Sequence, residues 1–134
     1  MKLDLNCMRD VLLYLEEWLV LDDDLNFHTL DISDLCKGGI LLKYHASDIA
    51  YTVIKLEEAG FITASIQYVS GQIYWIGISS LTFEGHQFLD TIRPASTWDK
   101  ILSICDKTEL KSIKTIMEIS DILLPDTIRN ALHS

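Results

Sequence analysis

Apolar residues recur at helical spacing near the beginning of the chain. Four of them are separated by four, three and four positions: Met8, Leu12, Leu15 and Leu19. Because residues at these spacings lie on one side of an α-helix, the pattern predicts a helix that begins after Asn6 as its N-cap and ends near Leu21. Three adjacent carboxylates follow: Asp22, Asp23 and Asp24. They repel one another, so we expect a solvated turn there.

A second helical stripe lies in the middle of the chain, where Ile49, Val53 and Leu56 recur at spacings of four and three. Ser47 is a suitable N-cap and Gly60 a suitable left-handed stop, which predicts a helix over residues 47–59. The segment before this helix, residues 29–35, alternates between apolar and polar positions. This alternation fits a short strand or the entry to another helix.

Apolar and polar residues alternate from Ile62 to Tyr68, and a second apolar run covers residues 73–78. The Ser70-Gly71 pair lies between the two runs and predicts a tight β-hairpin. A helix, a glycine stop and a hairpin, preceded by two helical segments, follow the order of a winged helix-turn-helix. In that fold the hairpin is the wing.

The last third of the chain is predicted to be helical. Thr82 is the expected N-cap of a helix that ends at Arg93, because Pro94 cannot continue the hydrogen-bonded ladder. Ser96 opens another helix with a Ser-x-x-Asp capping box, and Thr108 is the expected cap of a final helix. These elements predict an α+β, mainly helical fold. A winged helix-turn-helix domain with a two-stranded wing occupies residues 1–93, and a C-terminal helical extension over residues 94–134 packs on the same core.

The final helix is apolar over more than half of its circumference, which predicts burial on two sides. The second side is covered either within the monomer or at the seam of a homodimer. Pro125 is expected to kink or restart this helix.

The charge of the chain is strongly negative. It has 20 acidic and 11 basic residues, a net charge of −9, and residues 1–61 hold 12 of the acidic and five of the basic residues. Such a field repels phosphate backbones and favours basic partners. No stretch approaches the about 18 uninterrupted apolar residues of a membrane span, and no signal-peptide core is present. We therefore expect a cytoplasmic protein that binds no membrane. The three cysteines lie far apart and are expected to be buried thiols, with no metal or cofactor.

Three strings carry a resemblance that extends over nearly the whole chain. They are Cys7-x-Arg9-Asp10-Val11-Leu12-Leu13, Leu56-x-x-Ala59-Gly60-Phe61-Ile62 and Leu81-Thr82-x-x-Gly85-His86-x-Phe88-Leu89. Together they resemble domain of unknown function 2513, a family of bacterial and prophage proteins. The resemblance implies a winged-helix fold and a mobile-element setting, but no activity. One position departs from the family, because Thr52 stands where its members usually carry histidine.

The segment from Thr82 to Arg93 contains a candidate chemical site. His86, Asp90 and Arg93 lie at spacings of four and three, so they form one row along the predicted helix. A histidine–carboxylate pair can orient a general base, as in a hydrolase, but no nucleophile or metal ligand accompanies this one. We therefore favour a structural network of Thr82, Gly85, His86, Asp90 and Arg93, and we expect no enzyme. Gly85 costs a helix ~1 kcal/mol relative to alanine, which indicates close approach to another helix or to the wing.

In a winged helix the 47–59 helix would be the recognition helix. Its predicted outward face consists of Ser47, Asp48, Tyr51, Ile54, Lys55 and Glu58. One lysine stands against two acids on this face, whereas DNA recognition uses cationic and amide side chains. Tyr51 and Ile54 are either anchors for a protein partner or are covered by the C-terminal helices, and Tyr74 is a further aromatic candidate on the wing.

These observations predict a non-enzymatic protein-binding protein. In the mobile-element setting it would be a phage- or prophage-encoded inhibitor or modulator of a host or defence protein with a basic, nucleic-acid-binding surface. Occlusion or mimicry of nucleic acid would be its mechanism, with Asp22, Asp23, Asp24, Asp48 and Glu58 steering the partner. The alternative is a DNA-binding transcriptional regulator, in which a dimer gathers Lys37, Lys43 and Lys55.

Overall fold

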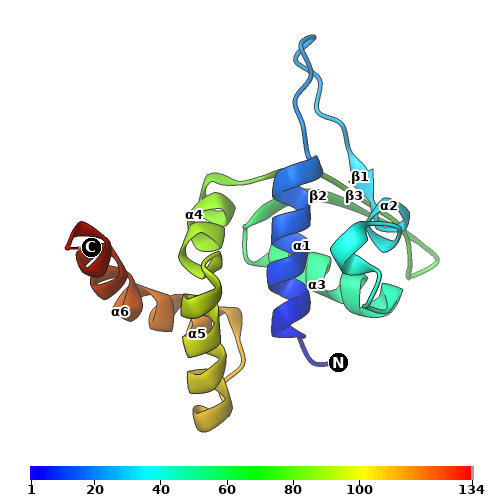
Figure 1. Cartoon of the computed structure of the whole chain (residues 1–134). Helices are drawn as coiled ribbons and strands as arrows, with labels where there is room; N and C mark the ends of the chain where they lie inside the picture. Colours follow the sequence, from blue (N-terminus) through cyan, green and yellow to red (C-terminus); the bar gives the residue numbers. More distant parts are fainter. Residues whose placement is uncertain (134) are drawn as a thin grey trace. The chain divides into compact units, whose positions relative to one another are not determined.

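The computed structural model describes residues 1–133 and contains, within them, six α-helices and one three-stranded antiparallel sheet (Figure 1). The protein is therefore of the α+β class and mainly helical, as predicted. The chain forms two compact units, Met1–His86 and the residues from Gln87 onward. The boundary between these units falls inside the helix Phe83–Ile92, and the predicted division into domains after Arg93 stays a prediction.

The first helix, α1, spans Leu5–Trp18. Its N-cap is Asp4, whose carboxylate accepts a hydrogen bond from the Cys7 amide at 3.0 Å. The predicted cap, Asn6, is wrong because Leu5 is buried and belongs to the first turn. The predicted end near Leu21 is also wrong, since the backbone becomes extended at Leu19.

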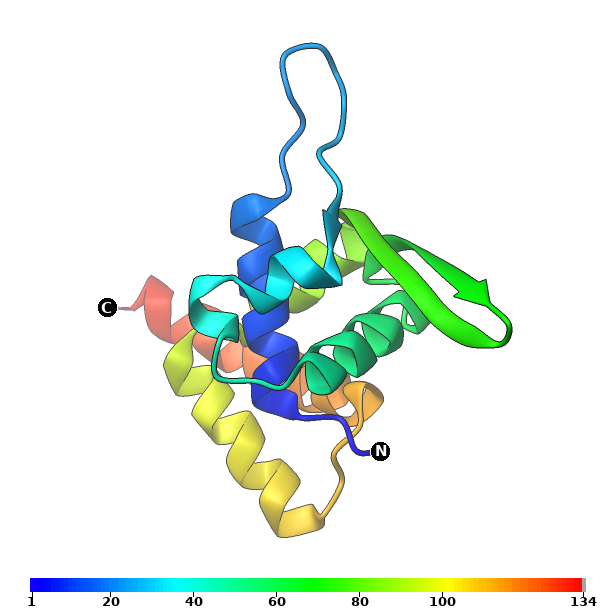
Figure 2. The ribbon, with the colours of Figure 1, turned by 90° about the vertical axis from the view of Figure 1, so that its right-hand side faces the viewer.

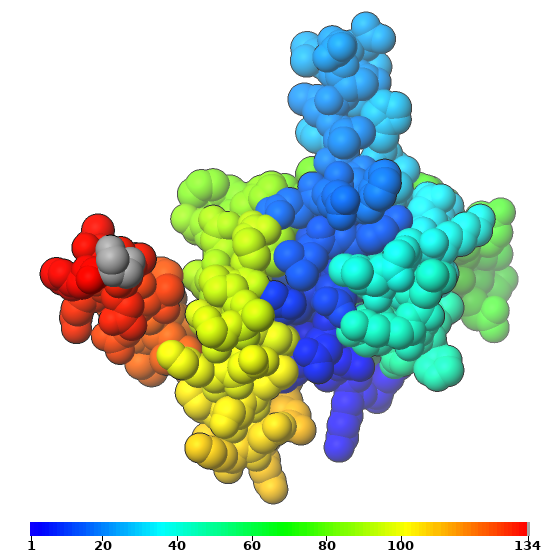
Figure 3. All heavy atoms as spheres, in the orientation of Figure 1, coloured from blue at the N-terminus to red at the C-terminus, as the bar shows by residue number. Residues whose placement is uncertain are grey.

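Residues 19–29 form a protruding segment that we call the arm. It turns back on itself, because Leu21 pairs with Phe27 in an antiparallel bridge and the His28 amide donates to the Val20 carbonyl at 3.1 Å. The expected solvated turn of aspartates is the tip of this longer structure. Figure 3 shows the arm standing out from the surface of the first unit.

Both alternatives for residues 29–35 are realised in succession. Strand β1 covers Leu30–Asp31, and helix α2 follows directly over Ile32–Cys36. Asp31 and Asp34 start α2 with a reciprocal capping box, in which each carboxylate accepts from the amide of the other residue. A short 3₁₀ turn, η1, covers Gly39–Leu41.

Helix α3 spans Ala46–Glu58 and is the predicted central helix. It begins earlier than expected, with His45 rather than Ser47 at the N-cap position. Its end agrees with the sequence, because Gly60 has a φ of +79°, which is left-handed. This conformation is unstrained for glycine, so the chain can leave the helix and enter the sheet at once.

The predicted hairpin is present as strands β2, Ile62–Val69, and β3, Gln72–Leu81. Ser70 and Gly71 both have positive φ, as a tight two-residue turn requires. Strand β1 adds to the other edge of β3, with Leu30 opposite Ile78, so the strand order is β1-β3-β2. Side chains from α1, α3 and the sheet fill the core of this unit: Met8, Val11, Leu12, Leu15, Ile49, Val53, Leu56, Ile76 and Ile78.

Three helices complete the chain: α4 over Phe83–Ile92, α5 over Ala95–Thr108 and α6 over Ile113–Leu132. The predicted capping box at Ser96 is wrong, because α5 already begins after Pro94, whose carbonyl accepts from the Trp98 amide. Thr108 ends α5 instead of opening α6, and Ser112 caps α6 by accepting from the Thr115 amide at 3.1 Å.

Helix α6 packs against α5 with one side and continues through Pro125 without restarting. Its buried residues are Ile116, Ile119 and Ser120. Another set of apolar side chains is exposed: Met117, Ile122, Leu124, Ile128 and Leu132. One of the two predicted buried sides is thus covered, and the homodimer seam stays a prediction.

Candidate protein-binding surfaces

The outward face of α3 matches the face predicted from helical spacing. Ser47 and Glu58 are exposed, and Asp48, Tyr51, Ile54 and Lys55 are half-buried. The Lys55 ammonium lies 2.9 Å from a Glu58 carboxylate oxygen and 5.3 Å from the centre of the Tyr51 ring. The hydrogen bond to Glu58 raises the pKa of Lys55. The single cation of this face is therefore engaged by its own neighbours.

The arm carries the three predicted aspartates. Asp22 organises the tip, since its Oδ1 accepts from the amides of Asp24 and Asn26, both at 2.9 Å, and its Oδ2 lies 2.9 Å from His28 Nε2. These bonds, led by the one from the Asn26 amide, lower the pKa of Asp22. Asp23 and Asp24 have exposed side chains. Figure 2 shows the arm pointing away from the part of the unit that contains α3, so the structure does not bring the two acidic groups together.

Sequence reasoning missed a set of apolar side chains around these aspartates. Five large ones are exposed by 50% to 77%: Trp18, Val20, Leu21, Leu25 and Phe27. They have no helical or strand periodicity, so no pattern assigned them to a surface. The signal in the sequence was that all five lie within residues 18–27, the same segment that contains the three adjacent aspartates.

A groove of about 310 Å³ lies at the base of the arm. Leu19, Val20, Leu21 and Phe27 from the arm and Leu81 from β3 line it, together with polar residues that include Ser79 and His86. His86 therefore faces a hollow on the surface of the first unit.

The start of α4 is joined to the start of the hairpin. The Thr82 hydroxyl donates to the Gly60 carbonyl at 2.6 Å and accepts from the Gly85 amide at 3.0 Å, and the Thr82 amide donates to the Phe61 carbonyl at 3.0 Å. A Cβ atom on Gly85 would overlap the Phe61 carbonyl oxygen. Gly85 thus permits a close backbone approach at this junction.

The rest of the predicted row on α4 is arranged differently. Arg93 and Asp90 form an ion pair at 2.8 Å on the surface. Within residues 1–133 no hydrogen bond or ion pair joins His86 to Asp90. The five residues proposed as one network therefore divide into the Thr82–Gly85 junction, the Asp90–Arg93 pair and His86 in the groove.

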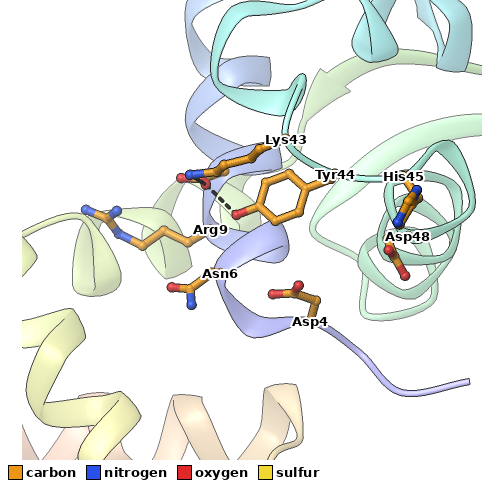
Figure 4. Close-up of a pocket in the computed structure, with 8 residues that line it drawn as sticks. Asp4, Asn6, Arg9, Lys43, Tyr44, His45 and Asp48 are labelled. Carbon is orange, nitrogen blue, oxygen red and sulfur yellow. Dashed lines mark hydrogen bonds and ion pairs between the residues drawn. The ribbon is translucent and has the colours of Figure 1, made fainter.

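A polar hollow of about 570 Å³ lies between the start of α1 and the start of α3 (Figure 4). The Tyr44 hydroxyl donates to Asp10 Oδ2 at 2.6 Å, and the Lys43 ammonium lies 3.2 Å from the same oxygen. Burial and then this hydrogen bond raise the pKa of Tyr44. Acidic and basic side chains alternate around the hollow, so we interpret this cluster as a tie between α1 and the turn before α3.

The three cysteines lie in the core or are partly covered. Cys7 and Cys105 are buried, Cys36 is half-buried, and all three are free thiols. Burial raises the pKa of Cys7 to about 11. In the described part of the chain no group of three or more His, Cys, Asp or Glu side chains is placed to hold a metal ion.

The hairpin offers exposed aromatic and aliphatic side chains without charge. Tyr74 is 74% exposed, and Tyr68, Val69 and Ile73 are exposed beside it. No charged residue occurs between positions 59 and 83. The hairpin therefore adds no cation to any surface of the first unit.

Taken together, the fold defines a small α+β protein with an acidic N-terminal unit, an arm that exposes apolar side chains around three aspartates, and an uncharged hairpin. The chain belongs to the family described as Hypothetical protein (DUF2513), whose sequence model matches residues 2–111. This match confirms the family predicted from the three strings. Helix α6 lies beyond the matched residues. No curated protein and no solved structure matches the chain. Among the helices of residues 1–133, none has the length and apolar character to cross a membrane.

Proposed function

We propose that this protein is a non-enzymatic binding protein whose partner is a protein with a basic, nucleic-acid-binding surface. We infer that residues 1–93 are a winged helix-turn-helix domain. The order α1, β1, α2, α3, β2, β3 and the sheet order β1-β3-β2 support this inference. In this arrangement α3 takes the place of the recognition helix and the β2–β3 hairpin that of the wing.

The Lys55–Glu58 ion pair carries the proposal. A recognition helix needs cations that are available to phosphates and base edges. Lys55 is the one basic residue on the outward face of α3, and it is held by Glu58 at 2.9 Å and lies over the Tyr51 ring. Asp48 adds a further negative charge to the same face, and the hairpin contributes no positive charge. This face suits a positively charged surface better than a double helix.

Charge over the whole first unit supports the same partner class. Residues 1–86 contain 13 acidic and five basic residues. Such a field accelerates encounter with a basic protein and can occupy the site where that protein holds nucleic acid. Occlusion or mimicry of nucleic acid is the mechanism we propose. In the prophage setting expected for the family, the partner is a host or defence protein.

Titration with duplex DNA at low and at physiological salt tests the proposal. We expect no binding at either salt concentration. Phosphate contacts would instead give tight binding that weakens steeply as salt rises, and this result would contradict the proposal.

A second measurement addresses the partner. Proteins captured by the immobilised chain from the producing host are challenged with duplex DNA, which should displace a partner that uses its nucleic-acid site. Captured proteins that DNA does not displace would exclude mimicry.

The alternative function is DNA binding by a transcriptional regulator, and the same element order favours it. It requires a dimer that gathers Lys37, Lys43 and Lys55. Lys43 is paired with Asp10 and Lys55 with Glu58, so two of these three cations are engaged within the unit. The salt titration separates the two functions.

A further inference from the structure

The groove at the base of the arm is lined by apolar and by polar side chains. The apolar lining consists of Leu15 of α1, Leu19, Val20, Leu21 and Phe27 of the arm, and Leu81 of β3. Ser79 and Ser80 of β3, Glu16 and His86 supply polar groups. Its volume of about 310 Å³ is enough for one or two large apolar side chains and not for a bound domain.

The arm that forms one wall of the groove is ordered although its apolar side chains are exposed. The Leu21–Phe27 bridge and the three acceptor contacts of Asp22 fix its backbone. Leu25 is 77% and Phe27 58% exposed. Holding such side chains in water on a fixed projection is unfavourable for an isolated molecule, and contiguous apolar exposure of this kind marks interaction sites.

Strand β3 provides an edge beside the groove. The pairing of β1 with β3 extends only over Leu30–Ile78 and Asp31–Gly77. Ser79, Ser80 and Leu81 continue β3 beyond Leu30, the first residue of β1, and line the groove beside the arm. An extended segment can therefore lie along this part of β3 beside the arm, because strand addition satisfies backbone groups while alternate side chains enter a pocket.

The charge around the groove indicates which kind of extended segment it would bind. Residues 16–28 contain five acidic residues and no lysine or arginine. Glu16 lines the groove, and Asp22, Asp23 and Asp24 lie at the tip of the arm above it. A ligand for this surface needs positive charge beside apolar side chains.

We propose that the groove at the base of the arm is the docking site for an extended segment of the partner in which lysine or arginine alternates with large apolar residues. This inference rests on the proposed function, since it names the part of the basic partner that is bound. It also moves the principal contact from α3 to the arm. The apolar side chains enter between Phe27 and Leu81, and the cations face Glu16 and the aspartates of the tip.

A second copy of the chain is the less favourable occupant. Pairing two arms would bring two sets of five acidic residues together with no compensating cation in residues 16–28. Like charges at this distance oppose association. The test nevertheless includes a measurement of the molecular mass in solution.

The test uses the full chain and three short synthetic peptides, with calorimetry to measure affinity. In the first peptide lysine alternates with leucine, in the second lysine alternates with serine, and in the third glutamate alternates with leucine. We expect the first peptide alone to bind. Amide resonances of Val20 and Ser79–Leu81 should shift on binding, whereas those of α3 should not.

Variants locate the site. The double substitution Leu21→Ser/Phe27→Ser changes exposed side chains and should weaken the first peptide at least about tenfold, as expected for central apolar anchors. Leu42→Ser/Leu110→Ser removes comparable exposed side chains away from the arm and should leave the affinity unchanged. Asp23→Asn/Asp24→Asn should reduce the salt dependence, whereas Glu118→Gln/Asp121→Asn in α6, which removes the same charge, should not.

Several outcomes would overturn the inference. Equal binding of the lysine–serine peptide would show that charge alone suffices. Resonance shifts confined to α3 would place the contact there. A wild-type dimer that Leu21→Ser/Phe27→Ser dissociates would identify a second copy as the occupant. If the peptides fail but a captured basic protein depends on Tyr51 and Glu58, the docking site is wrong and the proposed function stands. DNA binding without a protein partner would contradict both the docking site and the proposed function.

Discussion

The ammonium of Lys55 and the carboxylate of Glu58 lie 2.9 Å apart on the outward face of α3. This pair engages the one lysine of that face with a neighbouring carboxylate. Reversing the charge of the face therefore tests the inferred orientation of α3.

We expect Asp48→Lys/Glu58→Lys to create non-specific DNA binding, which we do not expect of the wild-type protein. The substitutions add two cations and release Lys55, and cationic contacts to phosphates supply most non-specific affinity. A gel-shift or anisotropy titration at two salt concentrations measures the effect. Glu118→Lys/Asp121→Lys in α6 changes the charge equally and should not create comparable binding. Equal binding by both variants would mean that net charge, and not the position of α3, is responsible.

Gly85→Ala should destabilise the protein by about 1–3 kcal/mol, the range for overpacking. The added methyl group meets the Phe61 carbonyl oxygen, a backbone atom that cannot rotate away. Denaturant unfolding followed by circular dichroism measures the change. Gly39→Ala is the matched control, because a Cβ atom there meets nothing within 4 Å. A Gly85→Ala variant as stable as the wild type would contradict the close approach.

Tyr44→Phe should cost about 0.5–1.5 kcal/mol at neutral pH, because it removes the hydrogen bond to Asp10. At alkaline pH, by contrast, the substitution should reduce the loss of stability that accompanies rising pH. The pKa of Tyr44 is raised above its usual 10.0 in the folded state, so the unfolded chain loses its proton first and stability falls as pH rises above about 10. Denaturant midpoints measured from neutral to alkaline pH should therefore decline less steeply in the variant. A slope identical to that of the wild type would exclude this contribution.

Asp22→Ala should loosen the arm without unfolding the protein. The substitution removes Oδ1, which accepts from both the Asp24 and Asn26 amides, and Oδ2, which contacts His28. Hydrogen exchange of the amides at positions 24, 26 and 28 should accelerate, while exchange in α1 and β3 stays unchanged. Asp23→Ala removes an adjacent carboxylate and serves as the control. Unaltered exchange in Asp22→Ala would show that the Leu21–Phe27 bridge alone orders the arm.

Local chemistry explains which elements were predictable from the sequence. The hairpin was predicted because Ser70-Gly71 can adopt two consecutive positive φ values, and the end of α3 because Gly60 is left-handed. Helix starts were less accurate. Asp4 and Asn6 are both good N-caps, and only the burial of Leu5 decides between them. The sequence favoured Ser96 as the start of α5, but the helix begins after Pro94, which makes no side-chain capping bond.

The candidate surfaces divide along the same line. Helical period placed Asp48, Tyr51, Lys55 and Glu58 on one face, because that arrangement depends on the helix alone. The arm could not be predicted from the sequence, since its shape depends on one bridge and on backbone bonds to Asp22. The groove was harder still to predict from the sequence, because it joins the end of α1 to a part of β3 about 60 positions later in the chain.

The uncharged hairpin also bears on how the molecule behaves in concentrated solution. All 20 acidic residues lie outside positions 59–83, so mutual repulsion between molecules is weakest at the hairpin. Its outer strand β2 has a partner on one side and carries none of the lysines or prolines that commonly protect an edge. As pH falls towards the isoelectric point and the remaining repulsion fades, colloidal association should begin by edge-to-edge joining of β2 strands.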